Sequence, residues 1–178
     1  MLSLPDLREK LRISAASISQ MAFAPEGDNL ALRTTNGLAL WSRQANQTLW
    51  EVPQSDAGCL AFSSDGRLLF SRNDHRAVIM RRVDDGDFVS HLGVHRAALS
   101  SLAVSADGRT LATADREGTI RLSHVPTGRD LFDLHNTGRI TYVLGFSADS
   151  RSLVAHVGVD PITHQEQIAV FETGSREY

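Results

Sequence analysis

A pattern of short apolar runs separated by tight turns recurs four times along the chain, with a period of ~41 residues. The third copy, Leu99–Ser123, shows it most clearly and reads L-S-S-L-A-V-S-A-D-G-R-T-L-A-T-A-D-R-E-G-T-I-R-L-S. In every copy an apolar residue anchors the run before the first turn, and these anchors are Phe23, Phe62, Val104 and Phe146. Self-similarity at a fixed period indicates a repeat architecture, which constrains the fold more than any single local feature.

Each repeat is predicted to form four short β-strands, named a to d in chain order. The turn after strand a contains Asp-Gly in the second and third copies, Glu-Gly in the first and Asp-Ser in the fourth. Asp and Gly suit tight hairpins because they tolerate positive φ and form local hydrogen bonds. In the third copy the predicted strands are Leu99–Val104, Thr110–Thr113, Thr119–Ser123 and Asp130–Leu134. Four strands of about five residues with three turns fill the period.

Such a sheet cannot bury both of its faces alone, so we expect the sheets to stack on one another. Radial stacking of four-stranded sheets gives a β-propeller, with strand a nearest the axis. We expect strand a to be the most apolar strand and to have neighbours on both faces. The predicted fold is therefore an all-β propeller of about four blades in one domain, residues 1–178. The blade units are approximately 14–53, 54–92, 95–134 and 135–178.

The repeats resemble those of the WD40 family over roughly residues 14–174. His95 stands where the family has the His of its Gly-His pair, and Glu117–Ile120 stands where it has Asp-Gly-Thr-Ile. Trp41 and Phe171 lie at or within one residue of the family's Trp position. That family joins a His, a Ser or Thr, an Asp and a Trp in one polar network per blade. No repeat here contains the full set, since Ser123 replaces the Trp in the third copy. We therefore expect each blade to lack a satisfied buried polar set and to be only modestly stable.

The ends of the chain leave the closure of the ring open. The fourth repeat has strands a to c and then ends in T-G-S-R-E-Y. Leu11 lies twelve residues before Phe23, as Leu134 lies twelve before Phe146. Residues 4–13 could thus supply the missing outer strand, and a short helix with a Ser and Pro-Asp start is the alternative. Because propellers similar to these usually have seven or eight blades, three arrangements stay open: a four-bladed ring, a ring completed by dimerisation, or a fragment with missing blades.

Composition excludes several classes of function. The chain is 42% hydrophobic and 22% charged with a net charge of −3, which favours neither nucleic acid nor an anionic membrane as a partner. No apolar run approaches the ~20 residues needed to span a bilayer, and no secretory signal is recognisable, so we expect a cytoplasmic protein. The arginines of the second repeat adjoin acidic residues, which indicates a solvated surface rather than a phosphate-binding track. The lone Cys59 is expected to be a buried, inert thiol.

No motif in the sequence specifies a chemistry. The seven histidines lack metal-ligand spacing, and no nucleophile elbow, phosphate-binding loop or dinucleotide fingerprint occurs. The carboxylate pairs fall in predicted turns. We therefore expect no catalytic residues, no metal and no cofactor.

The resemblance implies a protein–protein interaction scaffold that presents a loop face to a peptide or protein partner. The fourth repeat has a long connection between strands b and c, His156–Gln167, in which Asp160 begins a turn and Ile162 is an exposed apolar contact. A simple hairpin extension is the alternative for this loop, and a structural role is the alternative for His95. The candidate partner-binding residues are His75, Arg76, His95, Arg96, Arg116, Glu117, Arg139, Asp160, Ile162 and His164. Two other functions stay open: a regulatory or sensor fragment of a larger multidomain protein, such as a kinase- or NTPase-linked protein, and an enzyme that uses the propeller face. A homodimer is a further possibility for the partner.

Overall fold

The computed structural model describes residues 17–53, 58–73, 76–135, 141–160 and 162–173, and these form antiparallel β-sheets. Three sheets have four strands and one has three within the described residues. The prediction of an all-β protein with about four blades is thus confirmed. The strand or helix expected at residues 4–13 lies outside the described residues.

The strands of each blade follow one another in chain order and pair with their neighbours in sequence. Blade one contains β1 Gln20–Phe23, β2 Asn29–Arg33, β3 Gly37–Ser42 and β4 Gln47–Pro53. Blade two contains β5 Ala61–Phe62, β6 Leu68–Asn73, β7 Ala77–Arg82 and β8 Phe88–Leu92. Blade three contains β9 Leu99–Val104, β10 Thr110–Asp115, β11 Thr119–His124 and β12 Arg129–His135. Blade four contains β13 Tyr142–Phe146, β14 Ser152–Val159 and β15 Glu166–Glu172.

The turn between strands a and b is built in the same way in three blades. In blade two the Ser63 hydroxyl donates to the Asp65 carboxylate over 2.5 Å, and the N–H of Arg67 donates to the same carboxylate oxygen over 3.0 Å. The N–H of Leu68 donates to Ser63 Oγ over 2.9 Å. Gly66 has φ of 70°, a conformation that glycine adopts without a steric cost. The same bonds are made in blade three by Ser105, Asp107, Arg109 and Thr110, and in blade four by Ser147, Asp149, Arg151 and Ser152. The predicted Asp-Gly turns are therefore present with a specific set of bonds.

Apolar side chains fill the space between consecutive blades, because successive residues of a strand point to opposite faces of its sheet. Between blades one and two the buried residues are Ala31, Leu38, Leu40, Leu69 and Val83. Between blades two and three they are Phe70, Val78, Met80, Leu92, Leu99, Leu111 and Val125. Between blades three and four they are Ala112, Ala114, Ile120, Val143, Leu153 and Ala155. Each junction is a separate small core, as expected for a stacked repeat.

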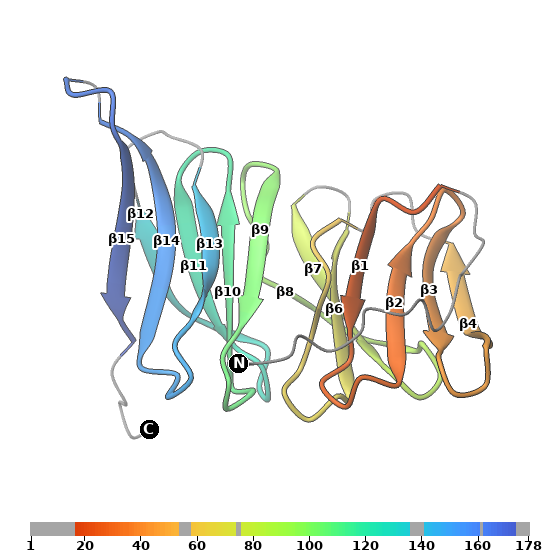
Figure 1. The fold of residues 1–178 in the computed structure, drawn as a ribbon. Helices are drawn as coiled ribbons and strands as arrows, with labels where there is room; N and C mark the ends of the chain where they lie inside the picture. The colour runs from red at the N-terminus through yellow and green to blue at the C-terminus, as the bar shows by residue number, and fades with distance from the viewer. Residues whose placement is uncertain (1–16, 54–57, 74–75, 136–140, 161, 174–178) are drawn as a thin grey trace, which may run out of the picture.

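The four blades stand side by side in an arc, with blade one at one end and blade four at the other (Figure 1). The first strand of each blade is less buried than predicted. The residues of β1 are mostly exposed and those of β9 mostly half-buried, whereas the middle residues of β2, β6 and β10 are fully buried. The expectation that strand a would be the most enclosed strand is therefore wrong. In an arc the second and third strands are covered by the adjacent blades, while the first strand borders the open inner side.

Candidate interaction surface

The loops predicted to share one face do lie together. In Figure 1 the β2–β3 and β10–β11 connections, the β14–β15 hairpin and the connection from β8 to β9 lie at the same end of the arc. We call this end the loop rim; it includes the described residues Arg76, 94–98, 116–118, Asp160 and 162–165. Two of the candidate residues, His75 and Arg139, lie outside the described residues.

Backbone hydrogen bonds join three adjacent loops of the rim. The N–H of His95 donates to the carbonyl of Arg76 over 2.8 Å, which joins the loop between blades two and three to the β6–β7 turn. The N–H of Arg116 donates to the carbonyl of Ala98 over 3.0 Å, which joins the same loop to the β10–β11 turn. The side chains of Arg76, Arg96 and Arg116 are exposed. The rim therefore presents three arginines from three loops whose backbones are fixed to one another.

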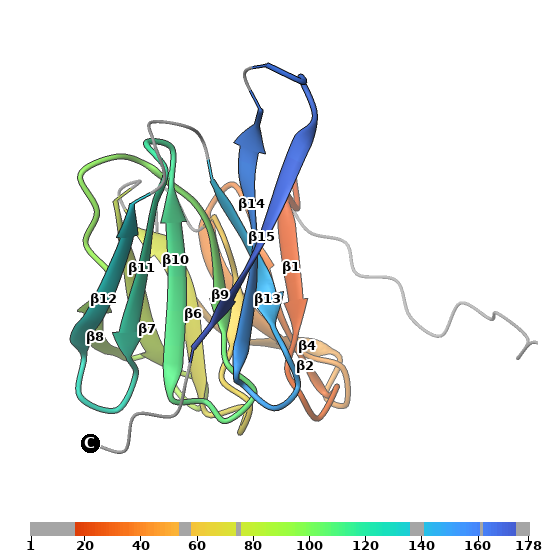
Figure 2. The ribbon, with the colours of Figure 1, turned by 90° about the vertical axis from the view of Figure 1, so that its left-hand side faces the viewer.

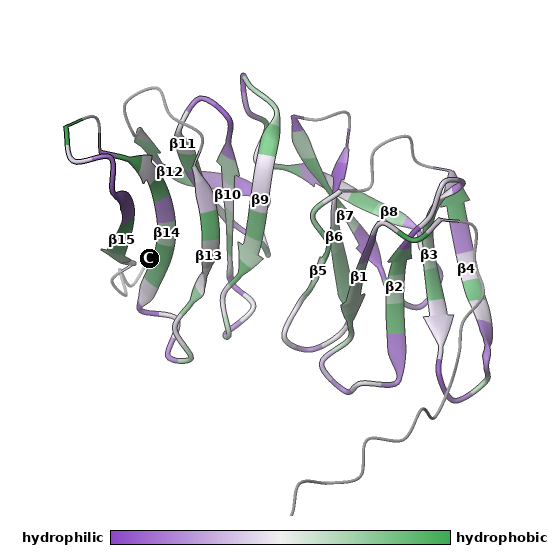
Figure 3. Cartoon of the chain, turned by 45° about the horizontal axis from the view of Figure 1, so that its top comes forward, coloured by the Kyte–Doolittle hydropathy of each residue, from purple (hydrophilic) through white to green (hydrophobic). Residues whose placement is uncertain are grey.

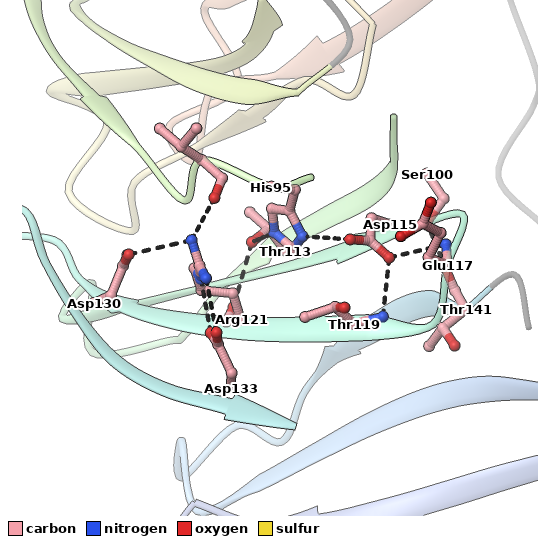
Figure 4. A network of polar contacts seen from close by, with 11 residues as sticks. His95, Ser100, Thr113, Asp115, Glu117, Thr119, Arg121, Asp130, Asp133 and Thr141 are labelled. Atoms are coloured by element: carbon pink, nitrogen blue, oxygen red, sulfur yellow. Dashed lines mark hydrogen bonds and ion pairs between the residues drawn. The ribbon is translucent and has the colours of Figure 1, made fainter. Parts of the chain in front are cut away.

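His95 lies beneath this surface and not on it. Its imidazole is buried, with Nδ1 2.9 Å from the Asp115 carboxylate and Nε2 2.7 Å from the Thr113 hydroxyl (Figure 4). A side chain enclosed in this way cannot contact a partner, so its inclusion among the partner-binding residues is corrected to the structural alternative. Thr113 was not singled out in the sequence, although its position two residues before Asp115 on the same strand places both side chains on one face.

Asp115 also holds the turn that carries Arg116 and Glu117. Its second carboxylate oxygen accepts the N–H of Glu117 over 3.0 Å and the N–H of Thr119 over 2.9 Å. Asp115 itself is almost completely buried. One carboxylate thus fixes both the loop before blade three, through His95, and the β10–β11 turn.

The expectation that every blade lacks a satisfied buried polar set is therefore wrong for blade three. Its His, Thr and Asp form a connected network even though Ser123 stands where the WD40 pattern has Trp. Ser123 forms its own bond instead, donating from its hydroxyl to Asp130 over 2.8 Å. The hydrogen bonds of His95 to Asp115 and Thr113 form in this blade without the Trp.

Arg121 extends the polar contacts of blade three to its last strand, β12. The Arg121 guanidinium makes two bonds of 2.7 Å to the Asp133 carboxylate and an ion pair of 3.3 Å to Asp130, and it donates to the carbonyl of Val94 (Figure 4). Bidentate pairs of this kind fix geometry as well as charge. Arg121 thus ties β11 and β12 to the residue directly before His95. Arg121 was not singled out in the sequence, although an Arg and an Asp on two adjacent predicted strands are the signal for such a pair.

Burial lowers the pKa of His95 below its ordinary value, although the hydrogen bond to Asp115 opposes this shift. The imidazole is therefore neutral near pH 7, with Nδ1–H assigned as the donor to Asp115 and Nε2 as the acceptor from Thr113.

We expect the protein to lose stability as the pH falls through the range below about 6.5, the ordinary value for His. The pKa of His95 is lower in the folded than in the unfolded state, so the unfolded state binds more protons in that range. The contribution is fully present above 6.5 and is lost as the pH falls toward the folded-state pKa. Urea unfolding across this range checks it, and a His95→Gln variant should show a smaller dependence on pH. An equal dependence in both proteins would contradict the assignment.

The long connection of blade four is mostly strand. The prediction placed a loop over His156–Gln167, but β14 continues to Val159 and β15 begins at Glu166, and Val159 pairs with Glu166. The hairpin therefore projects beyond the other turns of the rim (Figure 2). At its tip the Asp160 carboxylate accepts the N–H groups of Ile162 and Thr163 over 2.8 and 2.7 Å. Ile162 is 86% exposed, and His164 is exposed with φ of 55°.

The described residues contain no group of three or more His, Cys, Asp or Glu placed to hold a metal ion. Cys59 is half-buried, not fully buried as expected, and its Sγ lies 3.5 Å from the carbonyl of Ser100. Within the same part of the chain no helix is long and apolar enough to cross a membrane.

Four-blade stacking with the first strands on the inner side defines this chain as a repeat protein of the β-propeller class. Two family models match it: the WD40 domain of anaphase-promoting complex subunit 4 over residues 21–103, and the WD domain, G-beta repeat, over residues 86–122. These matches confirm that the repeats of this chain are similar to those of the WD40-repeat family, as the sequence predicted.

Curated relatives match parts of the chain. Autophagy-related protein 18 of Scheffersomyces stipitis is 34% identical over 103 residues, which are 56% of this chain and 17% of that protein. Autophagy-related protein 18 of Komagataella pastoris is 36% identical over 92 residues, 50% of this chain and 16% of that protein. WD repeat-containing protein 55 of Danio rerio is 28% identical over 127 residues, 67% of this chain and 33% of that protein. The chain thus spans a third or less of the length of these three relatives.

Solved structures show the same fold at low sequence identity. The structure of U3-55K superposes with a TM-score of 0.71 at 18% identity and covers 89% of this chain and 53% of that one. The RRP9 WD40 repeats superpose with a TM-score of 0.71 at 18% identity, covering 89% and 52%. Hydrazine synthase of Kuenenia stuttgartiensis superposes with a TM-score of 0.70 at 15% identity, covering 94% and 53%. The chain is therefore similar to about half of each of these chains, and the likeness concerns the fold alone.

Proposed function

We propose that the chain is a non-catalytic interaction module whose loop rim binds a protein or peptide partner. The observation that carries this proposal is the set of three exposed arginines, Arg76, Arg96 and Arg116, on loops that share backbone hydrogen bonds. Surface positions held by a buried network lose little entropy when they bind, which is the advantage of a preorganised site. WD40 relatives are consistent with a scaffold role, and no feature of the described residues favours catalysis.

The charge of the rim sets the class of partner. The planar guanidinium of each arginine can donate two parallel hydrogen bonds to a carboxylate. In the turn 116–118, Glu117 is the acidic residue. The exposed Ile162 at the hairpin tip adds an apolar contact. We therefore expect an acidic peptide segment with an apolar residue as the preferred ligand.

Selection of short peptides from a random display library, followed by affinity measurements, tests this function. Peptides selected by the wild-type chain should be acidic, and their affinity should fall about tenfold or more in an Arg96→Glu/Arg116→Glu variant, since exposed charge pairs are each worth ~1 kcal/mol. The matched control is Arg129→Glu/Arg151→Glu, which reverses two exposed arginines away from the rim. Equal loss in the control, or peptides that bind the rim variant as well as the wild type, would refute the rim as the site.

A further inference from the structure

The connection between blades two and three, residues 93–98, has one buried side chain, and we call this connection the strap. The imidazole of His95 is completely enclosed, whereas Val94 is 59% exposed and the other side chains of the strap are exposed or half-buried. The β10–β11 turn beside the strap is hydrophilic (Figure 3) and contacts it through the backbone bond from Arg116 to Ala98. A segment with so few buried apolar contacts can open while the sheets around it stay folded.

The strap also closes over the hydrogen-bond partner of His95. Gly93 has φ of 55°, and a Cβ at this position would lie 3.0 Å from the hydroxyl oxygen of Thr113. The backbone of the strap therefore lies directly over the hydroxyl that donates to Nε2 of His95. Because the ring and the hydroxyl are both enclosed, a charge that forms on the ring is not solvated by water.

Charged groups face His95 from three strands. Asp115 on β10 accepts a hydrogen bond from Nδ1, Arg121 on β11 places a cation nearby, and Asp133 on β12 pairs with that guanidinium. The β6–β7 turn contacts the strap through its backbone, since the carbonyl of Arg76 accepts the N–H of His95 and the Arg76 side chain is exposed. Burial outweighs the attraction of Asp115, and so the closed strap keeps the pKa of His95 below its ordinary value.

A second proton on the ring would rearrange these bonds. The neutral ring accepts the Thr113 proton at Nε2, whereas an imidazolium donates from both nitrogens. The Thr113 hydroxyl would then have to turn to the carbonyl of Arg121, which lies 3.3 Å away (Figure 4). Outside the enclosure the same imidazolium is hydrated, so acid favours a strap that has left its place.

We propose that protonation of His95 releases the strap, so that the loop rim holds an acidic partner near neutral pH and loses it in mildly acidic solution. Release moves Arg96, which follows His95 directly, and breaks the backbone bonds to Arg76 and Arg116. The three arginines then no longer form one preorganised surface. This inference rests on the proposed function for its ligand, but release of the strap is measured in the free protein.

Amide hydrogen exchange of the free protein tests the release. Protection of the His95 and Arg116 amides, relative to an unstructured chain at the same pH, should fall by up to about tenfold per pH unit below about 6.5. The core amides of β6 should remain better protected, because the strap opens without them.

Two variants and one direct titration assign the effect to His95. A His95→Gln variant should show no such fall in protection. The control His164→Gln, which changes an exposed histidine of the blade-four hairpin, should keep it. NMR titration of the His95 imidazole in the wild type needs no variant, and the closed strap should give a midpoint below about 6.5.

Peptides selected by the rim at neutral pH connect the release to binding. The affinity of the wild-type chain for such a peptide should fall by about threefold or more between about pH 7.5 and about pH 5.5, as the competent rim becomes less populated. The carboxylates of the peptide stay ionised over this range, and the affinity of the His95→Gln variant should be unchanged.

Three results would overturn the inference. One is equal protection of the strap amides across the range. Another is protection that falls to the same level in the strap and in β6, which would mean that the proton acts on unfolding of the whole domain. The third is a peptide affinity that does not change with pH. If no peptide binds the rim at neutral pH, the proposed function fails, and the exchange data still decide whether a proton releases the strap.

Discussion

Replacing Asp115 with alanine is expected to lower the free energy of unfolding by about 3 kcal/mol, because a buried carboxylate that accepts several hydrogen bonds is removed. The imidazole of His95 and the N–H groups of Glu117 and Thr119 would lose their acceptor while His95 stays enclosed. Both the loop before blade three and the β10–β11 turn depend on these bonds. Urea unfolding followed by tryptophan fluorescence and circular dichroism measures the loss.

The matched control for Asp115 is Glu117→Ala in the same turn. Glu117 is exposed and its backbone N–H, not its side chain, bonds to Asp115, so this change should alter the free energy of unfolding by less than about 0.5 kcal/mol. Equal free energies of unfolding in the two variants would show that the network does not stabilise the fold. The Asp115 variant should also bind rim-selected peptides more weakly, because Arg116 would no longer sit on a fixed turn.

Replacing Phe70 with alanine is expected to cost about 3–5 kcal/mol of the free energy of unfolding, because it empties the centre of a packed core. Phe70 on β6 is fully buried and packs with Val78, Leu99 and Leu111 between blades two and three. A stacked repeat protein depends on such junctions, so the two blades should also separate more easily. The same unfolding experiment measures the loss of stability, and native-state hydrogen exchange of β6 and β10 measures the separation.

Phe88→Ala is the control for Phe70 within the same blade. Phe88 on β8 is 51% exposed, and its ring lies 4.9 Å from that of His91. Its removal should cost less than about 1 kcal/mol, since it leaves no enclosed cavity. A comparable loss in both variants would show that the stability of blade two does not depend on the junction with blade three.

The sequence predicted the strands well because their signals are local. Asp-Gly and Asp-Ser turns limit the strands on both sides, and the apolar alternation distinguishes the buried face, so β9 was predicted with its observed bounds Leu99–Val104. The hairpin of blade four was predicted less well, since β14 continues through Val157 to Val159 and β15 begins at Glu166, within the segment predicted as a loop.

The candidate surface was predicted in part. The sequence predicted loops that share one face and contain Arg76, Arg96, Arg116 and Ile162. In the structure these residues lie on the loop rim. The sequence also offered His95 as a surface residue, because it does not show that the ring turns inward to Asp115 twenty residues later. Thr113 and Arg121 were missed for the same reason, since both are ordinary strand residues until the partners they meet are known.

The sequence by itself determined the repeat, the four blades and the turn chemistry, because period, alternation and turn residues act over a few neighbouring positions. Only the tertiary structure decided that the first strands are partly open, that His95 is enclosed, and that Ile168 and Val170 of blade four are exposed. These depend on contacts between residues far apart in the chain. Burial and hydrogen bonding at such positions arise only when the blades are packed together, so no local pattern specifies them.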